Sequence, residues 1–276
     1  MTNTKVILLG TGTPALTPGR YQSATAIIVN DQPYIVDCGS GCLERIVEAR
    51  SNGIRELTFE KLNKLFLTHF HPDHTVGLPG FLISPWIRGR RVVDVFGPTG
   101  TKEMIEGILT TFKKGINEHL YHGPKKLDNL RVDANDFTEG VIYKDELVEV
   151  EAIKVMHGTF DAYGFKFNTP DKTIVLSGDT RPVPKLYQKA ANCDILIHEV
   201  YCEAEIQQFP QGFRKYFKEV HTSGTELGRI AQEVNPGLLV LTHQILYNSP
   251  KTKLIDEIRA NYKGELAFGN DLDLFE

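Results

Sequence analysis

The segment Thr68–His74 constrains the fold of this chain more than any other. It follows an apolar, strand-like run and carries His69, His71, Asp73 and His74. A strand that ends here must gather these side chains into one small volume, where they are costly to bury unless a cation lies among them. Neutral imidazole and carboxylate suit zinc, or iron or manganese with less preference. The segment therefore predicts a metal centre at a strand end.

Two metal ions suit this segment better than one. His69 and His71 alternate to one side of a turn, while Asp73 and His74 come round to the other. Three further apolar runs end in potential ligands, namely His157, Asp179 and His243. Strands that end in His or Asp indicate one edge of a sheet that collects ligands. We therefore expect distant parts of the chain to complete a two-metal site.

The order of these motifs resembles that of a known superfamily. His-x-His-x-Asp-His, a strand-end His, Ser-Gly-Asp-Thr and Leu-Thr-His follow one another as in the metallo-β-lactamase superfamily, and most closely its ribonuclease Z and arylsulfatase-like branch. Further segments that carry the resemblance are 8–14, 36–41, 95–100, 177–182, 196–199 and 221–223. The resemblance implies an α/β fold, the four-layer αββα sandwich, formed as a single domain over residues 1–276.

The resemblance also implies which residues bind metal. One ion would be held by His69, His71 and His157, the other by Asp73, His74 and His243, with Asp179 bridging both. The expected cofactor is two Zn²⁺ per chain, with Mn²⁺ or Fe as alternatives. A water shared by two dications loses a proton near neutral pH and can attack an ester, so the expected activity is that of a metal-dependent hydrolase.

Three residues are expected to act in catalysis, Asp73, His221 and Glu199. In the branch, the residue that matches His221 protonates the leaving group and is paired with a glutamate, because a carboxylate raises the pKa of an imidazole. The rival interpretation is that His221 only precedes a helix, which begins with the capping box of Ser223 and Glu226. Asp37 either orients a ligand imidazole or caps the turn at Gly39.

Several features bear on the substrate. Ribonuclease Z suggests precursor tRNA, but the residues between His157 and Asp179 leave no room for the long arm that grips tRNA in that family. Pro72 favours a closer resemblance of this chain to the arylsulfatase-like and lactonase-like relatives than to ribonuclease Z. The basic residues that remain are Lys113, Lys114, Lys125, Lys126 and Arg131. We favour a phosphodiesterase acting on a small molecule or short oligonucleotide, with weak or no tRNA binding.

Two alternatives stay open. One is a ribonuclease Z-type endonuclease that processes tRNA 3′ ends, or a nucleic-acid-processing or partner-binding protein in which the enzyme role is secondary. The other is an arylsulfatase-type or lactonase-type ester hydrolase. The net charge of −4 argues against a generally basic nucleic-acid-binding surface.

Composition sets the remaining expectations. The chain has 276 residues, 41% of them apolar, and four cysteines that are too few for a disulfide scaffold. No leader peptide or membrane-length apolar run is evident, so a cytoplasmic protein without membrane contact is predicted, with a homodimer as one possible assembly. The expected strands are 5–9, 24–29, 33–37, 63–68, 92–96, 147–156, 162–168, 173–178, 194–198 and 237–242. The expected helices are 40–50, 99–112, 183–190, 223–234 and 250–260, and the polar stretch 113–146 is expected to form surface loops.

Overall fold

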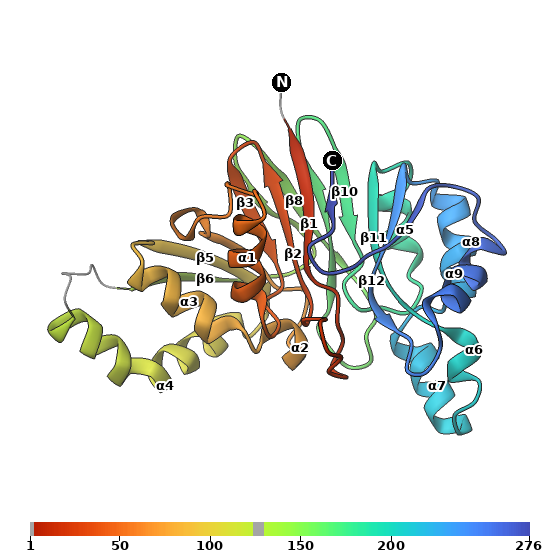
Figure 1. Ribbon diagram of the computed structural model, residues 1–276, viewed down its shortest axis with the longest axis horizontal. Coiled ribbons are helices and arrows are strands. Elements are labelled where there is room, and N and C mark those ends of the chain that lie inside the picture. The colour runs from red at the N-terminus through yellow and green to blue at the C-terminus, as the bar shows by residue number, and fades with distance from the viewer. Residues whose placement is uncertain (1–2, 124–129) are drawn as a thin grey trace. The chain divides into compact units, whose positions relative to one another are not determined.

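The computed structural model describes residues 3–123 and 130–276. Its internal contacts group the chain into two compact units. Unit 1 comprises Met1–Gly10, Pro14–Phe137 and Asp271–Glu276, and unit 2 comprises Thr11–Thr13 and Thr138–Asn270. Each unit contains one mixed β-sheet with its own helices (Figure 1).

Unit 1 is built on a sheet with the strand order β14-β1-β2-β3-β4-β5-β6. Its strands are β1 (Thr4–Gly10), β2 (Ala24–Val29), β3 (Gln32–Val36), β4 (Lys64–Phe66), β5 (Val92–Pro98), β6 (Arg131–Phe137) and β14 (Leu274–Phe275). The strands from β14 to β3 pair antiparallel, and those from β3 to β6 pair parallel. Its helical segments are α1 (Cys42–Ser51), η1 (Phe59–Lys61), α2 (Pro72–Thr75), α3 (Leu78–Ile87) and α4 (Thr101–His122).

The apolar pattern explains why unit 1 folds in this way. β2 reads as an uninterrupted apolar and β-branched run, and all six of its residues are buried, as expected for a strand covered on both faces. Helices α1 and α3 lie in front of this sheet in Figure 1. They contribute Ile46 and Phe81 to a core that also contains Ile35 and Val95 from the strands.

Unit 2 repeats this plan with the strand order β13-β12-β11-β10-β9-β8-β7. Its strands are β7 (Gly140–Lys144), β8 (Glu149–Lys154), β9 (Tyr163–Asn168), β10 (Thr173–Leu176), β11 (Ile195–Tyr201), β12 (Leu238–Ile245) and β13 (Leu266–Phe268). Strands β7 to β10 pair antiparallel, and β10 to β13 pair parallel. Its helices are α5 (Pro184–Ala190), α6 (Glu203–Ile206), α7 (Gln211–Val220), α8 (Gly224–Val234) and α9 (Lys251–Arg259).

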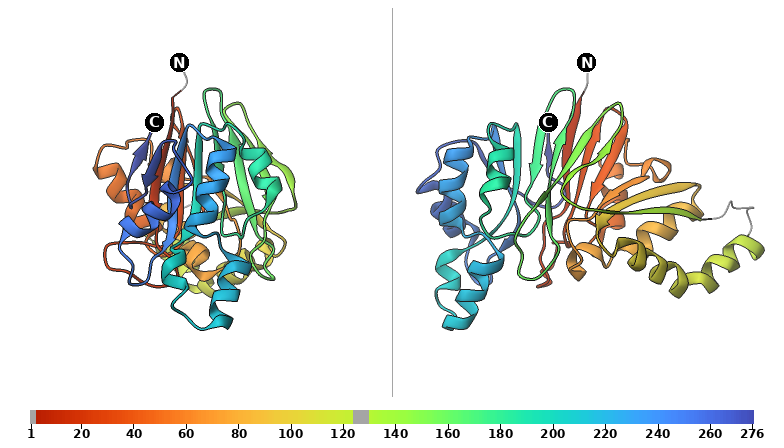
Figure 2. Two further views of the ribbon diagram at one scale, coloured as in Figure 1. Left: turned by 90° about the vertical axis from the view of Figure 1, so that its right-hand side faces the viewer. Right: turned by 180° about the vertical axis from the view of Figure 1, so that it is seen from behind.

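The helices of unit 2 begin and pack as their sequences predict. Helices α5, α8 and α9 lie together beside the parallel strands (Figure 1, Figure 2) and bury Leu186, Leu227 and Leu254 against them. The capping box is confirmed, because Ser223 accepts a bond from the backbone of Glu226 and the Glu226 side chain reaches back to the N-cap.

The expected strands and helices are present, and all but the helix predicted over 99–112 end within a few residues of the predicted bounds, but the expectation of loops over 113–146 is wrong. Helix α4 continues to His122, and the strands β6 and β7 follow it. The helix continues because Ile105, Leu109 and Ile116 form an apolar face that packs toward β6. Lys125 and Lys126 lie outside the described residues.

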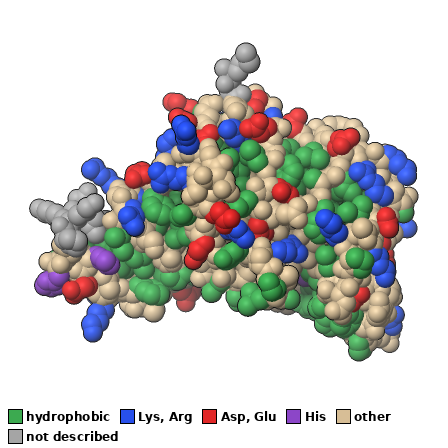
Figure 3. All heavy atoms as spheres, viewed as in Figure 1, with side chains coloured by type: hydrophobic (Ala, Val, Ile, Leu, Met, Phe, Trp, Pro, Cys, Tyr) green, Lys and Arg blue, Asp and Glu red, His purple; other side chains and the backbone are tan. Residues whose placement is uncertain are grey.

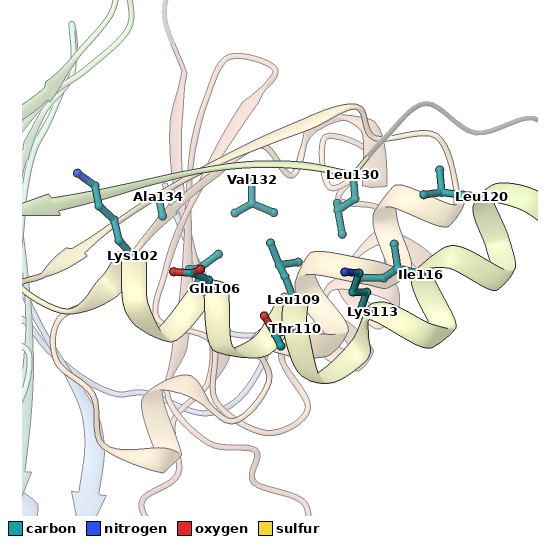
Figure 4. Close-up of a pocket in the computed structure, with 11 residues that line it drawn as sticks. Lys102, Glu106, Leu109, Thr110, Lys113, Ile116, Leu120, Leu130, Val132 and Ala134 are labelled. Carbon is teal, nitrogen blue, oxygen red and sulfur yellow. The ribbon is translucent and has the colours of Figure 1, made fainter.

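A groove of about 480 Å³ separates α4 from β6. Figure 4 shows Leu109, Leu130 and Val132 pointing toward one another across it, with Lys102 and Glu106 at its edge. Its apolar lining and mixed charges do not make a basic surface for RNA. None of the described helices has the length and hydropathy that a membrane span requires.

Candidate metal centre

In unit 1 the segment after β4 gathers the predicted ligands. His69, Asp73 and His74 are each at most 1% exposed, and the His69 and His74 rings lie 4.2 Å apart between centroids. His69 Nε2 and His71 Nδ1 are 3.0 Å apart, and His74 Nε2 is 3.6 Å from Asp73 Oδ2. Pro72 occupies the first turn of α2, a position that suits its fixed φ and missing N–H. The short helix carries Asp73 and His74 round toward the first two histidines.

Neighbouring side chains hold two of these imidazoles by Nδ1. Asp37, directly after β3, has its Oδ2 2.7 Å from His74 Nδ1, while its Oδ1 accepts a bond from the Thr68 backbone N–H at 2.8 Å. The Thr68 hydroxyl lies 3.0 Å from His69 Nδ1. Of the two interpretations of Asp37, the structure supports the orienting one. Anchoring Nδ1 in this way leaves Nε2 available as a ligand, the arrangement usual for metal-binding histidines.

Unit 2 brings together the other three predicted ligands. Asp179 Oδ2 lies 3.8 Å from His157 Nε2 and 3.4 Å from His243 Nε2, and all three side chains are at most 3% exposed. His157 Nδ1 is 2.8 Å from the carbonyl oxygen of Val220, so this imidazole also presents Nε2. Asp179 follows β10 and His243 lies near the end of β12, two strands of one parallel set that are separated by β11, so the sheet brings these predicted ligands together.

His243 owes its position to a β-bulge. Glu199 pairs with Thr242 and Val200 pairs with Gln244, so His243 is the extra residue on β12. Its φ of 44° lies in the left-handed region, which is uncommon for a residue with a Cβ and is often found at functional sites. Periodicity alone could not reveal this bulge, because β12 reads as a regular strand.

Unit 2 also brings together the two residues predicted to form an acid dyad. His221 Nδ1 lies 3.2 Å from Glu199 Oε2, and Glu199 Oε1 accepts backbone N–H bonds from Thr222 at 2.9 Å and Thr180 at 3.3 Å. Burial raises the pKa of Glu199 well above its usual range, and the two N–H donors oppose this effect by stabilising the carboxylate. His221 is the C-cap residue of α7 and faces Glu199, rather than merely preceding α8.

His221 can also offer a ligand atom. Asp179, His221 and His243 present nitrogen and oxygen atoms within 4.8 Å of one another. Geometry within unit 2 therefore admits His221 either as a proton donor or as a metal ligand.

The remaining histidines have other environments. His198 is fully buried beside Glu199, with Nδ1 2.6 Å from the Glu199 carbonyl oxygen and Nε2 3.5 Å from the Tyr187 hydroxyl. Burial lowers the pKa of His198 to about 4, so it is a neutral core residue at neutral pH. His119 and His122 belong to the last turn of α4, and surface histidines mark that end of the helix in Figure 3.

The donor sets fit transition metals. Each unit presents imidazole nitrogens and carboxylate oxygens, with an anchored Nδ1 on His69, His74 and His157. This combination is that of zinc sites and suits iron and manganese also. Sequence reasoning missed the anchors Thr68 and Val220, because a hydroxyl and a backbone carbonyl carry no motif of their own. The four cysteines are free and buried.

Comparisons with known proteins extend over nearly the whole chain. The model of the family described as Anti-Pycsar protein Apyc1 matches residues 4–247. Ribonuclease Z from Mycobacterium bovis (strain BCG / Pasteur 1173P2) is 29% identical over 281 residues, which cover 99% of this chain and 98% of the relative. Because so little of that relative lies outside the match, it has no long arm that this chain lacks. The missing arm therefore does not separate this chain from proteins named ribonuclease Z.

Solved structures share the fold. The metallo-β-lactamase fold protein YhfI from Bacillus subtilis aligns with a TM-score of 0.74 at 20% identity, covering 99% of this chain and 100% of that one. The short form of human tRNase Z gives 0.72 at 20% identity, with 99% and 98% covered. A diphosphatase of the PhnP family gives 0.68 at 16% identity, with 99% and 98% covered. The predicted α/β sandwich of the metallo-β-lactamase fold is confirmed.

Proposed function

The chain belongs to the family described as Anti-Pycsar protein Apyc1, and we propose that it is a metal-dependent hydrolase of small phosphodiesters. The observation that carries the proposal is the repeated anchoring of imidazoles in both units. His74 is held by Asp37, His69 by Thr68 and His157 by Val220, each through Nδ1. Core histidines have no need to present Nε2 together with carboxylates in this way, whereas metal ligands do.

The proposed ligand sets combine residues of both units. His69, His71 and His157 would hold one ion, Asp73, His74 and His243 would hold the other, and the carboxylate of Asp179 would serve both. Zinc suits this donor set, and manganese or iron are alternatives. When bound, two such ions supply Lewis acidity that polarises a phosphoryl oxygen and acidifies an attacking water.

Side chains of the protein are proposed to supply the proton and to position the groups that react. His221, paired with Glu199 at 3.2 Å, is the proposed donor of a proton to the leaving oxygen. The backbone N–H groups of Thr222 and Thr180 hold the carboxylate of Glu199 in place, so that its second oxygen faces the imidazole. Asp73, almost fully buried, is proposed as both ligand and catalytic residue.

Several features favour a small phosphodiester. A diphosphatase and a tRNase Z share the fold, which is compatible with phosphate ester chemistry. Of the basic residues considered for RNA binding, Lys113 and Lys114 lie exposed on α4, and Arg131 is paired with Asp133 at 2.7 Å. These described residues offer little positive charge for docking a folded RNA.

A substrate panel tests the proposal. Protein loaded with zinc or manganese would be assayed on an aryl phosphodiester, an aryl phosphomonoester, an aryl sulfate, a lactone and a cyclic mononucleotide. We expect turnover of the phosphodiesters, abolished in Asp179→Ala and unchanged in the exposed control Asp171→Ala. Turnover confined to the sulfate or the lactone would refute the phosphodiester assignment and support the other ester class.

A tRNA endonuclease is the second candidate, favoured by the 29% identity to a protein named ribonuclease Z over 99% of the chain. A protein that neutralises six or more phosphates loses on the order of a thousandfold in affinity between low and moderate salt. We expect weak binding without such a slope, and no efficient 3′-end cleavage of precursor tRNA. Single-site cleavage lost in Lys113→Ala/Lys114→Ala would establish the endonuclease instead.

A further inference from the structure

A row of aromatic rings leads away from the acid dyad in unit 2. The Phe217 ring lies 5.5 Å from that of His221, and Phe213 lies 4.9 Å from Phe217. Phe209 stacks on Phe213 at 4.8 Å with an interplanar angle of 25°. Tyr247 lies 5.1 Å from Phe209 and 6.3 Å from Phe217, so it covers the row.

The row runs from the interior to the surface. Phe217 is 4% exposed and belongs to a small cluster with Tyr201 and Ile206, whereas Phe209 and Phe213 are half-buried against it. Tyr247 is 48% exposed. Figure 3 shows hydrophobic side chains at the surface in the region of α6 and α7. An aromatic cluster that opens to solvent beside a buried acid dyad differs from an ordinary core, which closes over its rings.

The backbone holds Tyr247 in an unusual conformation. Its φ is 46°, in the left-handed region that disfavours residues with a Cβ. The loop is pinned by the buried Glu205, whose Oε1 accepts the Asn248 backbone N–H at 3.4 Å and whose Oε2 accepts the Ser249 hydroxyl at 2.8 Å. Strain that the surroundings enforce on an exposed aromatic residue points to a functional role for its position.

We propose that Tyr247, with Phe209 and Phe213, forms a stacking site for a planar aromatic ring carried by the leaving half of the substrate. We assign the ring to the leaving half of the substrate because the row of aromatic residues begins at His221. This residue is the proposed donor of the proton to the leaving oxygen. This inference rests on the proposed function and specifies its substrate as a phosphodiester with an aromatic leaving half. Stacked rings attract through their quadrupoles and their area, and a tyrosine keeps its hydroxyl in water while its face binds.

Two matched phosphodiesters separate planar stacking from general apolar contact. Benzyl methyl phosphate and cyclohexylmethyl methyl phosphate carry rings of similar size on similar alkoxides, but only the first ring is planar. Binding of each to the zinc-loaded protein would be measured by calorimetry, which requires no turnover. We expect the benzyl compound to bind about tenfold more tightly. Tyr247→Ala should bring the ratio close to one, and Tyr247→Phe should keep it.

Controls make the result specific. Tyr121→Ala, which removes another exposed tyrosine, from α4, should leave the ratio unchanged. Circular dichroism and zinc content would show that each variant is folded and loaded. Equal or absent binding of the two compounds by the wild-type protein, or a ratio unaltered by Tyr247→Ala, would overturn the proposal. Absence of phosphodiester turnover in the substrate panel would instead refute the proposed function, so the two failures are distinguishable.

Discussion

Asp37 is the residue through which unit 1 orients His74. Asp37→Asn keeps the size of the side chain but weakens the 2.7 Å contact between Asp37 Oδ2 and His74 Nδ1. Loss of such an outer partner typically lowers metal affinity by about 10- to 100-fold. Competition with a chromogenic chelator would measure this loss, and the exposed Asp31→Asn is the control. Unchanged affinity in Asp37→Asn would show that Asp37 acts only on the turn.

His221 is proposed as a proton donor, and the geometry of unit 2 also admits it as a metal ligand. One variant separates the two roles. As a proton donor, His221→Ala should keep its metal and lose about two to four orders of magnitude in turnover of esters with poor leaving groups. The defect should shrink for an activated aryl leaving group, which departs without a proton. Equal losses on both substrates, together with loss of metal, would make His221 a ligand. Glu199→Gln should give a milder form of the first pattern.

His198 makes stability depend on pH. Its folded pKa of about 4 lies below the ordinary value of 6.5 because the imidazole is buried, so the unfolded chain binds the proton more tightly. Its contribution to stability is therefore complete above pH 6.5 and is lost as the pH falls toward 4. The free energy of unfolding of metal-free protein should fall by roughly 2–3 kcal/mol more between pH 7 and 4.5 in wild type than in His198→Gln. Parallel pH curves for the two proteins would contradict this.

At the scale of elements, we expect the bulge in β12 to depend on Gln244. Its buried side-chain amide donates to the carbonyl oxygens of Leu241 at 2.6 Å and Gly269 at 2.9 Å, beside the bulged His243. Gln244→Leu leaves the Gly269 carbonyl without this donor, which should cost about 1–3 kcal/mol of stability and weaken metal retention. Thermal unfolding and metal analysis would test this, with the exposed Gln208→Leu as control. Full metal content in Gln244→Leu would show that the bulge holds without its amide.

Elements with strong apolar periodicity were predictable from the sequence, and those shaped by tertiary context were not. β2 and α8 follow from a continuous apolar run and a capping box. Helix α4 was predicted too short, because Gly115 disfavours a helix after the polar pair Lys113 and Lys114, whereas the packing of Ile116 keeps the chain helical beyond it. β6 is polar along most of its length, and only its pairing with β5 makes it a strand.

The same division applies to the site. Ligands that lie within one short segment, such as His69 and His74, could be predicted because so many potential ligands occur close together in the sequence. The positions of Asp179 and His243 followed from strand ends, but the bulge at His243 follows only from the strand register. The anchor on His157 is a backbone carbonyl, which every residue possesses and which no sequence pattern can mark.

At the scale of the whole molecule, the proposed centre requires ligands from both units. Seven ligands exceed what one tetrahedral zinc can use, so purified protein should carry close to two transition-metal ions per chain. Metal that binds only the folded protein stabilises it, by about 4 kcal/mol at a free concentration a thousand times the Kd. We therefore expect chelation to lower the thermal midpoint of the wild-type protein markedly.

Two ligand variants, one in each unit, test whether a single centre joins them. His74→Ala and Asp179→Ala should each lose at least one ion and most of the stabilisation by zinc, because each contributes to a shared pair of ions. Asp179→Ala should have the larger effect, since its carboxylate is proposed to touch both. Elemental analysis and thermal unfolding with and without zinc would be compared with those of the exposed control Asp171→Ala. If one of the two variants kept both ions and the full stabilisation, the metals would belong to a single unit, and the shared centre would be wrong.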